Sequence, residues 1–524
     1  MSNIPKNTGL AHYPPLIQAL CKPDAYPHKT DEIRLVETHI SWVLLTGQTV
    51  YKIKKPLQFA FLDFSSLAQR LFFCREELRL NRRFAPDLYL DIVPITGTAE
   101  HPKLGGEAGE AIEYALKMRQ FAAGQLLSER ARSGQLGSDE IDQLAQTLAD
   151  FHGICAKASE DSEYGDSTSI RHWSDENFAC IRPLLNSEPL LQQLLRIQAW
   201  GDTEGRQKST LMQARKQQGH VRECHGDLHL NNITLINGKV TLFDCIEFNA
   251  ELRWIDVINE IAFLMVDLLH FGYDAYAYRV LNRYLQLTGD YAGLGLLRYY
   301  LVYRALVRAK LALLRMLQQQ DDGSIQQARD EYAVYADLAE RFTQNTRPVL
   351  MITHGFSGSG KSFLAGKLAE QTGALQIRSD IERKRLFGYQ AQDRTDGSIY
   401  TQEAGQKTYQ HLAGLAKIII EAGFSVIVDA ACLKSAQREL FRQLANGCGV
   451  RFVIIAVQAS EQTLRQRVGE RQNDASEATL EILQRQLQSA QALSAQEQQE
   501  TITVDTGNTT PVHNIAMIKT ALSQ

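Results

Sequence analysis

Short apolar runs, interrupted by turn residues and by one helical pattern, occupy the first 120 residues of the chain. The runs predict strands at residues 42–45, 50–54, 89–95 and 112–118. The first two flank a turn that contains Gly47, which is typical of paired strands. Residues 72–84 carry apolar positions at helical spacing, and we expect this helix to stop before Pro86.

The middle of the chain is mainly helical, with one strong hairpin signal. Asn237 and Gly238 separate the apolar runs 233–236 and 240–243, and an Asn-Gly pair between two such runs favours a tight β-hairpin. A long amphipathic helix is predicted at 296–317.

The pattern changes near residue 346, where we place a domain boundary. Residues 1–346 form the first predicted domain and end in a helical linker at about 319–346, whereas residues 347–524 form the second. Apolar runs in the second domain lie at 349–353, 375–378, 424–429 and 452–457 and alternate with helical patterns. This alternation predicts an α/β fold with a parallel sheet. Residues 484–499 are rich in Gln, Ala and Ser, but their leucine spacing favours a helix over disorder.

Composition places the chain among ordinary globular proteins. Of its 524 residues 44% are hydrophobic and 22% charged, which suggests two large or three smaller domains and excludes a collagen-like or wholly disordered chain. The eight cysteines include no CxxC pair, and this usage is typical of a reducing compartment. Because the sequence shows no long apolar run and no apolar N-terminal segment, we expect a cytoplasmic protein without a membrane partner.

Charge is divided unevenly along the chain. Residues 347–524 carry 19 Lys and Arg against 17 Asp and Glu, although the whole chain has a net charge of −4. A balance this close to neutral gives no general argument for a nucleic-acid partner. Nucleic acid therefore stays a possible but disfavoured partner, with residues 378–385 as its basic cluster, and the oligomeric state stays open.

A phosphate-binding pattern opens the second domain. Residues 355–362 (GFSGSGKS) match GxxxxGK[ST] between a predicted strand and a predicted helix, which is the context that the pattern requires. Gly355, Gly358 and Gly360 let backbone N–H groups approach phosphate oxygens at the N-terminus of the helix. Lys361 would reach the β- and γ-phosphates, and Ser362 would hold Mg²⁺. A Gly-Ser turn without a ligand is the disfavoured alternative.

An acidic residue behind this pattern completes a nucleotide site. Asp429 ends the apolar strand 424–429 and would support the Mg²⁺ shell. By itself such an acid is more often a cap at a strand end, so the functional interpretation depends on the preceding phosphate-binding pattern.

Residues 347–524 resemble the small P-loop kinases of metabolites or nucleic-acid ends, including gluconate-kinase-like, zeta-toxin-like and polynucleotide-kinase-like proteins. The resemblance rests on Arg378-Ser379-Asp380 with Arg383 and Lys384, on Asp429-Ala430, and on Arg467 and Arg471. It implies that Asp380 is the base facing the acceptor hydroxyl. It also implies that Arg467 and Arg471 offset charge on the transferring phosphoryl group. A helix N-cap at Asp380 and a solvated helix face at the two arginines are the structural alternatives.

A second ordered set of polar residues surrounds the predicted hairpin of the first domain. Asp227 and Asn232 precede the hairpin in HGDLHLNN, and Asp244 follows it. This is the order of base, metal-binding Asn and metal-binding Asp in kinase-fold phosphotransferases. Asp227 would orient or deprotonate the acceptor hydroxyl, whereas Asn232 and Asp244 would bind Mg²⁺. We assign His225 to holding the loop, and His229 to either role; a plain polar loop is the minority alternative.

Residues 30–318 resemble aminoglycoside phosphotransferases and choline-kinase-like proteins, and the resemblance implies an α+β, protein-kinase-like fold for the N-terminal domain. The resemblance implies ATP as cofactor and a strand lysine that pairs with a helix glutamate. Lys52 and Lys54 share one strand face, and Glu76 and Glu77 are both possible partners; we favour Lys52 with Glu77. Phe243-Asp244-Cys245 departs from the Asp-Phe-Gly of protein kinases, and no GxGxxG loop precedes Lys52.

Further acids follow the hairpin. Glu247, Asp256, Glu260 and Asp267 could line a site for a cationic or hydroxyl-rich acceptor. Helix capping and solvation are the favoured interpretation for most of them, since acids are rarely buried without a partner.

Together these features predict a bifunctional ATP-dependent kinase that uses Mg²⁺ at two separate sites to phosphorylate hydroxyl groups of small molecules. The pattern leaves the acceptors and the choice between ATP and GTP open. Two alternatives remain. One module, most readily the N-terminal one, could be a nucleotide-gated regulatory or pseudokinase domain, or the P-loop half could phosphorylate nucleic-acid ends or nucleotide-sugars.

Overall fold

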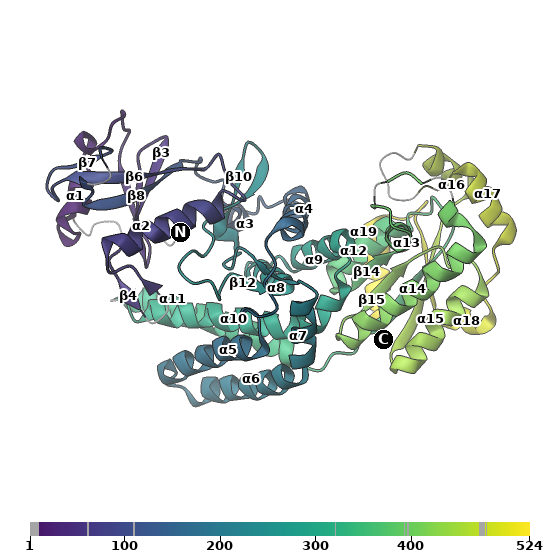
Figure 1. Ribbon diagram of the computed structural model, residues 1–524. Helices are drawn as coiled ribbons and strands as arrows, with labels where there is room; N and C mark the ends of the chain where they lie inside the picture. The colour runs from purple at the N-terminus through teal and green to yellow at the C-terminus, as the bar shows by residue number, and fades with distance from the viewer. Residues whose placement is uncertain are drawn as a thin grey trace. The chain divides into compact units, whose positions relative to one another are not determined.

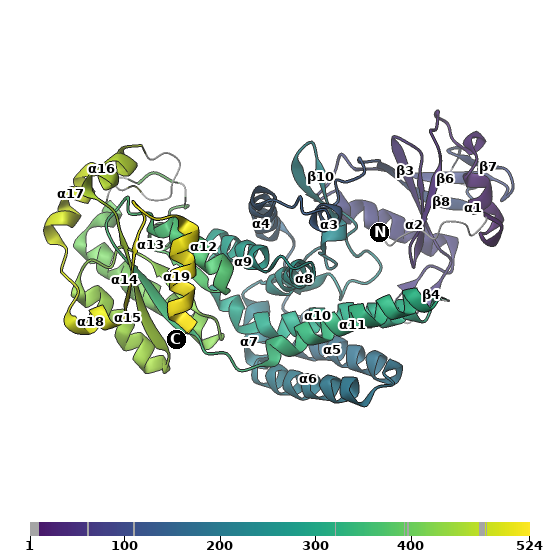
Figure 2. The same ribbon diagram turned by 180° about the vertical axis from the view of Figure 1, so that it is seen from behind.

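The protein forms two compact units (Figure 1; seen from behind in Figure 2). The computed structural model describes residues 10–59, 62–107, 110–319, 321–391, 393–395, 398–470, 477 and 479–523. The first unit comprises Met1–Gln143, Asp150–Ile170 and Arg215–Asp267, and the second Leu144–Ala149, Arg171–Ala214 and Leu268–Gln524. The chain thus contributes to the two units alternately, and the domain boundary near residue 346 stays a prediction.

An antiparallel sheet dominates the start of the first unit. Its strands lie in the order β1 (Arg34–Glu37), β2 (Ser41–Leu45), β3 (Thr49–Lys54), β8 (Glu113–Arg119), β6 (Tyr89–Gly97) and β7 (Pro102–Leu104). Helix α2 (Leu67–Asn81) packs against β6 and β8, and Leu88, Tyr89 and Leu116 are buried among the apolar residues between them. The four strands predicted in this region are confirmed, and the sheet supplies a rigid support for side chains on β3.

Helix α2 differs at both ends from the helix predicted at 72–84. The Ser66 hydroxyl accepts a hydrogen bond from the backbone N–H of Gln69 at 3.2 Å, and this cap lets the helix begin at Leu67. The helix ends at Asn81, well ahead of Pro86. The prediction was misplaced because apolar spacing does not register a polar cap.

The predicted hairpin is confirmed, and it carries the polar loops of the first unit. Strands β10 (Ile233–Ile236) and β11 (Lys239–Leu242) pair antiparallel. Asn237 and Gly238 have φ values of 52° and 76°, as a tight two-residue turn with left-handed backbone requires. A second pair, β9 (Val221–Glu223) with β12 (Trp254–Asp256), precedes the buried helix α8 (Val257–His270).

Shorter elements complete the first unit and the segments that both units share. The first unit also contains α1 (Pro15–Leu20), β4 (Gln58–Phe59), β5 (Leu62–Asp63) and α3 (Leu127–Arg132). Residues of α4 (Ser138–Ile154), α5 (Ser167–Ile181) and α7 (Ser209–Gln217) are divided between the two units.

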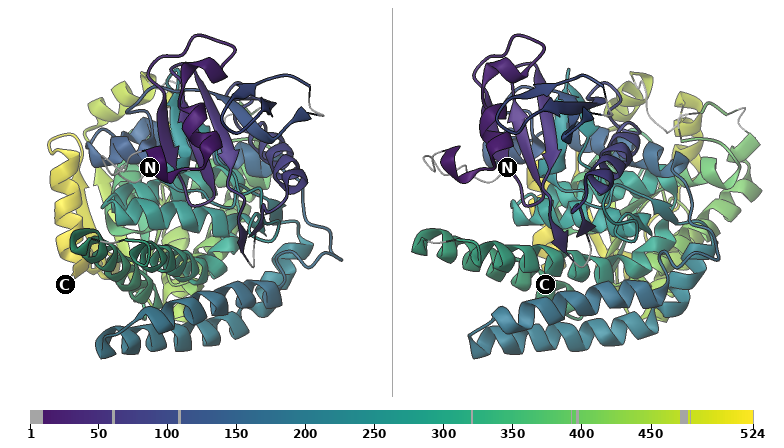
Figure 3. Two further views of the ribbon diagram at one scale, coloured as in Figure 1. Left: turned by 90° about the vertical axis from the view of Figure 1, so that its left-hand side faces the viewer. Right: turned by 60° about the vertical axis from the view of Figure 1, so that its left-hand side comes forward.

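The second unit begins with helices and ends with a parallel sheet. Its long helices are α6 (Glu188–Gln207), α9 (Asp274–Thr288), α10 (Leu294–Met316) and α11 (Asp322–Thr343). Helices α10 and α11 lie side by side (Figure 3). The stretch predicted as a helical linker therefore consists largely of a packed helix, in which Tyr332 and Tyr335 are buried. Among the described residues, no helix has both the length and the hydropathy needed to cross a membrane.

The parallel sheet predicted for the C-terminal part is confirmed. Its strands lie in the order β14 (Leu375–Arg378), β15 (Val426–Asp429), β13 (Val349–His354), β16 (Arg451–Gln458) and β17 (Thr501–Asp505). Helices α12 (Lys361–Thr372) and α19 (Pro511–Ser523) cover one face of it, and α14 (Gln402–Glu421) and α15 (Ser435–Cys448) cover the other (Figures 1 and 2). The carboxyl ends of β13, β14 and β15 therefore lie along one edge.

Two details of this region differ from the sequence pattern. Strand β17 was not predicted because polar Thr501 and Thr503 interrupt its apolar residues. The single helix predicted at 484–499 is instead two, α17 (Leu480–Ser489) and α18 (Ala495–Gln499), because Ala490 is extended and Ser494 caps a new helix. Two further short helices, α13 (Ser379–Leu386) and α16 (Glu461–Gly469), carry predicted site residues.

Candidate active sites

A buried ion-pair cluster joins the sheet, helix α2 and the segment after the hairpin in the first unit. The Nζ atom of Lys52 on β3 lies 2.7 Å from a Glu77 oxygen on α2 and 2.5 Å from an Asp244 oxygen. Burial alone would lower the pKa of Lys52, but the carboxylates of Asp244 and Glu77 raise it well above its usual value. Lys52 is therefore a fixed cation beside an acid that is still two-fifths exposed.

Lys54 forms a second ion pair with the same glutamate. Its Nζ lies 2.7 Å from the other Glu77 oxygen and also contacts Glu247. Glu76 instead faces Arg79 at 2.9 Å and Arg253 at 3.6 Å. Both candidate lysines thus contact Glu77, and Lys52 is the one that also contacts Asp244. The sequence did not reveal the pairing of Lys54 with Glu247, although Lys54 lies close in sequence to Lys52 and Glu247 to Asp244.

The loop before the hairpin brings Asp227 and Asn232 together. The Nδ2 atom of Asn232 donates hydrogen bonds to the backbone oxygen of Asp227 at 3.0 Å and to its carboxylate at 3.1 Å. His229 Nε2 lies 3.2 Å from the same carboxylate. The Asp227 side chain is one-third exposed, so an acceptor molecule can reach it.

His225 holds this loop against the segment after the hairpin, as its sequence position suggested. Its Nε2 lies 2.8 Å from the Phe243 carbonyl oxygen, and its Nδ1 lies 3.3 Å from the backbone N–H of Asp227. Burial lowers the pKa of His225, so the ring is neutral, with Nε2 as donor and Nδ1 as acceptor. Asp244 has a left-handed φ of 62°, and its N–H donates to the Tyr89 hydroxyl at 2.9 Å.

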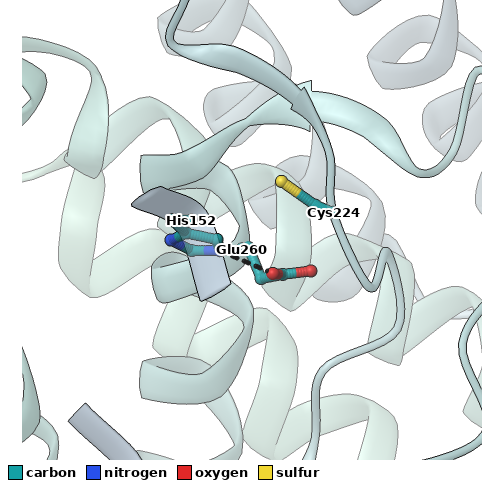
Figure 4. Close-up of side chains that lie close together, drawn as sticks. All are labelled: His152, Cys224 and Glu260. Atoms are coloured by element: carbon teal, nitrogen blue, oxygen red, sulfur yellow. Dashed lines mark hydrogen bonds and ion pairs between the residues drawn. The ribbon is translucent and has the colours of Figure 1, made fainter. Parts of the chain in front are cut away.

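Glu260 fixes the same loop, and its side chain lies beside those of His152 and Cys224 (Figure 4). One of its oxygens accepts the backbone N–H groups of His225 and Gly226 at 2.7 and 2.8 Å, and the other lies 2.8 Å from His152 Nε2. Burial would raise the pKa of Glu260, but the hydrogen bond from His152 leads the interactions that lower it below its usual value. His152 therefore orients Glu260, which in turn holds the backbone of the Asp227 loop. Sequence reasoning missed His152.

The geometry argues against a metal ion among these side chains. His152, Cys224 and Glu260 are near enough to share one, but both Glu260 oxygens already accept N–H groups. Burial also raises the pKa of Cys224 well above its usual value, which opposes the thiolate that a metal ligand requires. We interpret the cluster as a support for the Asp227 loop.

The other acids of this segment also hold structure. Asp256 forms a bidentate ion pair with Arg215 at 2.7 and 2.9 Å. Asp267 accepts the backbone N–H of Leu230 at 2.8 Å. All four acids, Glu247 included, are buried, so the expected surface solvation is wrong, and the contacts described give Asp256, Glu260 and Asp267 structural roles.

The P-loop of the second unit has the backbone that its glycines permit. Gly355, Gly358 and Gly360 have φ values of 149°, 85° and 85°. A Cβ on Gly355 would lie 2.4 Å from the Val457 carbonyl oxygen, so no larger residue fits. Lys361 opens helix α12, and its Nζ donates to the Phe356 carbonyl oxygen at 2.7 Å. The turn thus has the glycine backbone that a phosphate-binding loop requires, and it leads directly into helix α12.

Asp429 ends β15 next to this loop. One of its oxygens accepts from Gln376 Nε2 at 3.0 Å, and Arg378 Nε lies 3.8 Å away. Burial raises the pKa of Asp429, an effect that Arg378 and the Ser362 hydroxyl oppose. Ser362 and Asp429 are thus adjacent, which is where a divalent cation would need them. Gln376 was not singled out by sequence reasoning, since a lone glutamine in an apolar strand carries no motif.

The remaining predicted residues lie around the loop at different positions. Asp380 lies in the first turn of α13, whose N-cap position is Arg378, so Asp380 is not the N-cap residue. Arg467 on α16 donates to the Thr506 carbonyl at 2.9 Å and lies 3.5 Å from the Gly358 carbonyl. It is therefore tied to the P-loop backbone and is not a solvated helix residue. Arg471 lies outside the described residues.

Comparison with known proteins assigns both halves to families. Residues 61–297 match a family described as the phosphotransferase enzyme family, and residues 350–493 match one described as an AAA domain. These matches confirm the predicted order of a phosphotransferase-like part followed by a P-loop part, and they confirm the enzyme class.

Relatives extend over most of the chain. An uncharacterized protein of Mycobacterium tuberculosis strain H37Rv is 30% identical over 465 residues, which are 88% of this chain and 90% of that protein. An uncharacterized protein of Mycobacterium bovis matches with the same figures.

Solved structures match at lower identity. A sugar kinase from Janibacter is 23% identical with a TM-score of 0.27, and the match covers 34% of this chain and 95% of that one. A choline/ethanolamine kinase family protein from Mesorhizobium loti is 10% identical with a TM-score of 0.34, over 60% and 94% of the two chains.

Kinase families of both kinds imply the use of ATP. The chain therefore belongs to the family of these mycobacterial proteins, and it is an enzyme of the kinase class in which a phosphotransferase-family part precedes a P-loop part.

Proposed function

We propose that the chain is a bifunctional kinase with two ATP-dependent sites, each of which uses Mg²⁺ to phosphorylate a hydroxyl group of a small molecule. The observation that supports this most strongly is the presence of two separate sets of phosphate-handling groups. One joins Lys52, Glu77 and Asp244 near Asp227, and the other joins the P-loop to Asp429.

In the first site, the fixed cation of Lys52 would bind the nucleotide phosphates, and Glu77 would hold it in place. Asp227 would orient the acceptor hydroxyl and accept its proton as the new O–P bond forms. The neutral ring of His225 and the carboxylate of Glu260 keep the Asp227 loop in position. The Asp227 carboxylate would therefore need no rearrangement at the moment of reaction.

The oxygen atoms near Asp227 suit Mg²⁺. Asn232 uses Nδ2 to contact Asp227, which leaves its Oδ1 as the ligand atom, and Asp244 presents a partly exposed carboxylate. Hard oxygen donors of this kind are preferred by Mg²⁺. In the second site, Ser362 and Asp429 form the corresponding pair. A bound Mg²⁺ would supply positive charge that offsets the charge of the phosphate oxygens.

In the second site, the P-loop N–H groups and Lys361 would hold the β- and γ-phosphates. Asp380, at the carboxyl edge of the sheet, would accept the proton of the acceptor hydroxyl. Arg467 would offset charge on the transferring group once nucleotide draws it from the Thr506 carbonyl, and we propose the same role for Arg471.

The charges near Asp380 support a small acceptor over a nucleic-acid end. Lys384 lies 3.2 Å from Glu477, and Arg385 contacts Glu382. These ion pairs neutralise much of the basic cluster at 378–385 that a polyanion would need.

Transfer of γ-phosphate from labelled ATP to a fractionated metabolite extract tests the proposal. We expect Asp227→Asn to remove one labelled product and Lys361→Ala to remove another. Lys367→Ala is the matched control on the same helix, because Lys367 pairs with Glu370, which is not a predicted site residue. If the wild type labels no product, or if neither variant changes the products, the proposal is wrong.

A further inference from the structure

A helix from the phosphotransferase-matched part covers one edge of the P-loop sheet. Strand β14 is an edge strand, and helix α9 lies beside it and beside α12 within the second unit (Figures 1 and 2). The N–H of Gln376 donates to Asn282 Oδ1 at 2.7 Å, and Asn282 Nδ2 donates to the Ala374 carbonyl at 3.1 Å. The side-chain amide of Asn282 thus takes the place of a neighbouring strand.

The Gln376 side chain continues this contact to the phosphate site. Its Nε2 donates to Asp429 at 3.0 Å and to the Ser362 carbonyl at 3.2 Å, so two acceptors fix the orientation of the amide. Its Oε1 faces Gln286 Nε2 of α9 at 3.4 Å. The side chains of Gln286, Gln376 and Asp429 are all buried, so water does not readily replace these hydrogen bonds.

The turn after α9 holds the helix that carries Asp380. The Tyr291 hydroxyl, in the 3-10 turn η6 (Tyr291–Gly293), lies 3.0 Å from Glu382 on α13. Arg385 of α13 contacts Glu382 and the Gln286 carbonyl. The same short segment therefore contacts both the metal-binding edge and the acceptor edge of the P-loop site.

We propose that the α9–η6 segment (residues 274–293) positions the P-loop site through two contacts: Gln286 and Gln376 are positioning residues for Asp429, and Tyr291 together with the Gln286 carbonyl holds α13. The inference rests on the proposed kinase function of the P-loop half. It means that the phosphate site depends on a segment that belongs, by its family match, to the other half of the chain.

A single charge on Gln286 should reveal this role. In Gln286→Glu, the introduced carboxylate accepts hydrogen bonds but donates none at neutral pH, so it attracts the amide N–H group of Gln376 and repels its oxygen. The Gln376 amide must then turn, and its oxygen faces Asp429 in place of its N–H group. Asp429 loses a donor and faces a negative dipole, which disturbs the pair that it forms with Ser362.

The test uses the full chain with Asp227→Asn, so that Lys361-dependent ATP turnover reports the P-loop site alone. We expect Gln286→Glu to lower this turnover about tenfold and to raise the Mg²⁺ concentration for half-maximal turnover, since a hydrogen bond to a charged group carries that effect. Binding of metal-free ATP should change less than about twofold, because the P-loop N–H groups and Lys361 are untouched.

Arg279→Gln is the matched control. It removes the ion pair that Arg279 of α9 forms with Glu370 of α12, a contact in which neither Gln376 nor Asp429 takes part. If this control lowers turnover as much as Gln286→Glu, or if Gln286→Glu has no effect, the inference is overturned while the proposed function stands. If no Lys361-dependent turnover exists, the proposed function of this half is itself wrong.

A second variant tests the inference if Gln286→Glu destabilises the fold. If Gln286→Glu lowers the thermal midpoint more than Arg279→Gln does, Gln376→Met replaces it in the same assay. That substitution removes the donor to Asp429 without adding a charge, and the same loss of turnover is expected. Unchanged turnover in Gln376→Met overturns the inference.

Discussion

Removing Glu260 should both destabilise the first unit and impair its catalytic loop. In Glu260→Ala, three N–H donors lose their acceptor: the backbone groups of His225 and Gly226 and the ring of His152. Each unsatisfied buried donor costs about 1–3 kcal/mol, so for three donors we expect a loss of about 3–9 kcal/mol in unfolding free energy. Glu260→Gln keeps one oxygen for the two backbone donors and should cost about 1–2 kcal/mol.

Denaturant unfolding followed by tryptophan fluorescence, together with Asp227-dependent phosphate transfer, measures both effects. Glu251→Gln is the matched control, because Glu251 is exposed and should change stability by less than about 0.5 kcal/mol. Transfer by Glu260→Gln should fall through kcat, with the KM for ATP nearly unchanged, since Lys52 and Asp244 keep their places. If Glu260→Ala behaves like the Glu251 control, our account of the loop is refuted.

The difference in unfolding free energy between wild type and Glu260→Gln should depend on pH in one direction. The pKa of Glu260 is lowered in the folded protein, so its carboxylate contributes stability above the unfolded value of about 4.3. That contribution is lost as the pH falls through the lower folded value. The stability difference between wild type and Glu260→Gln should therefore be constant from about pH 6 to pH 8 and shrink below about pH 4. A difference that grows on acidification contradicts this.

Three further substitutions separate the roles of neighbouring groups. Lys52→Met should lower Asp227-dependent transfer at least about 100-fold with a modest loss of stability, because Glu77 keeps Lys54 as its partner; steady-state kinetics and thermal melting measure the two effects. Lys54→Met should cost about 3–5 kcal/mol in denaturant unfolding, because it leaves the buried Glu247 carboxylate unpaired. A larger kinetic than stability effect of Lys54→Met would reverse the two assignments. Gly355→Ala should abolish ATP binding to the P-loop, because its Cβ would overlap the carbonyl oxygen of Val457. Titration in the Lys52→Met protein, whose first site has lost its phosphate-binding cation, measures this, and unchanged binding would contradict the P-loop geometry.

The sequence indicated those parts of the fold that depend on local pattern. The Asn237-Gly238 turn and the P-loop glycines are positions where backbone conformation demands particular residues, so the residues predict the conformation. Helix α2 was displaced because its beginning depends on the Ser66 cap, a polar signal that apolar periodicity ignores. Strand β17 was missed because its place in the sheet comes from pairing with β16 and not from its own residues.

The candidate sites show the same distinction at the level of single side chains. Asp227, Asn232 and Lys361 are recognisable because each belongs to a motif whose residues lie close together in one loop of the chain. The partners that orient them come from distant segments: His152 lies 108 residues before Glu260, and Gln286 lies 90 residues before Gln376. No local pattern marks such residues, since a buried glutamine in one strand resembles any satisfied polar residue until its partners are known. Gln376 meets Asp429 and Gln286 only after the chain has folded. The proposed dependence of the P-loop site on the α9–η6 segment is therefore a property of the packed structure. Substitutions between α9 and β14 should uncouple that site from the segment.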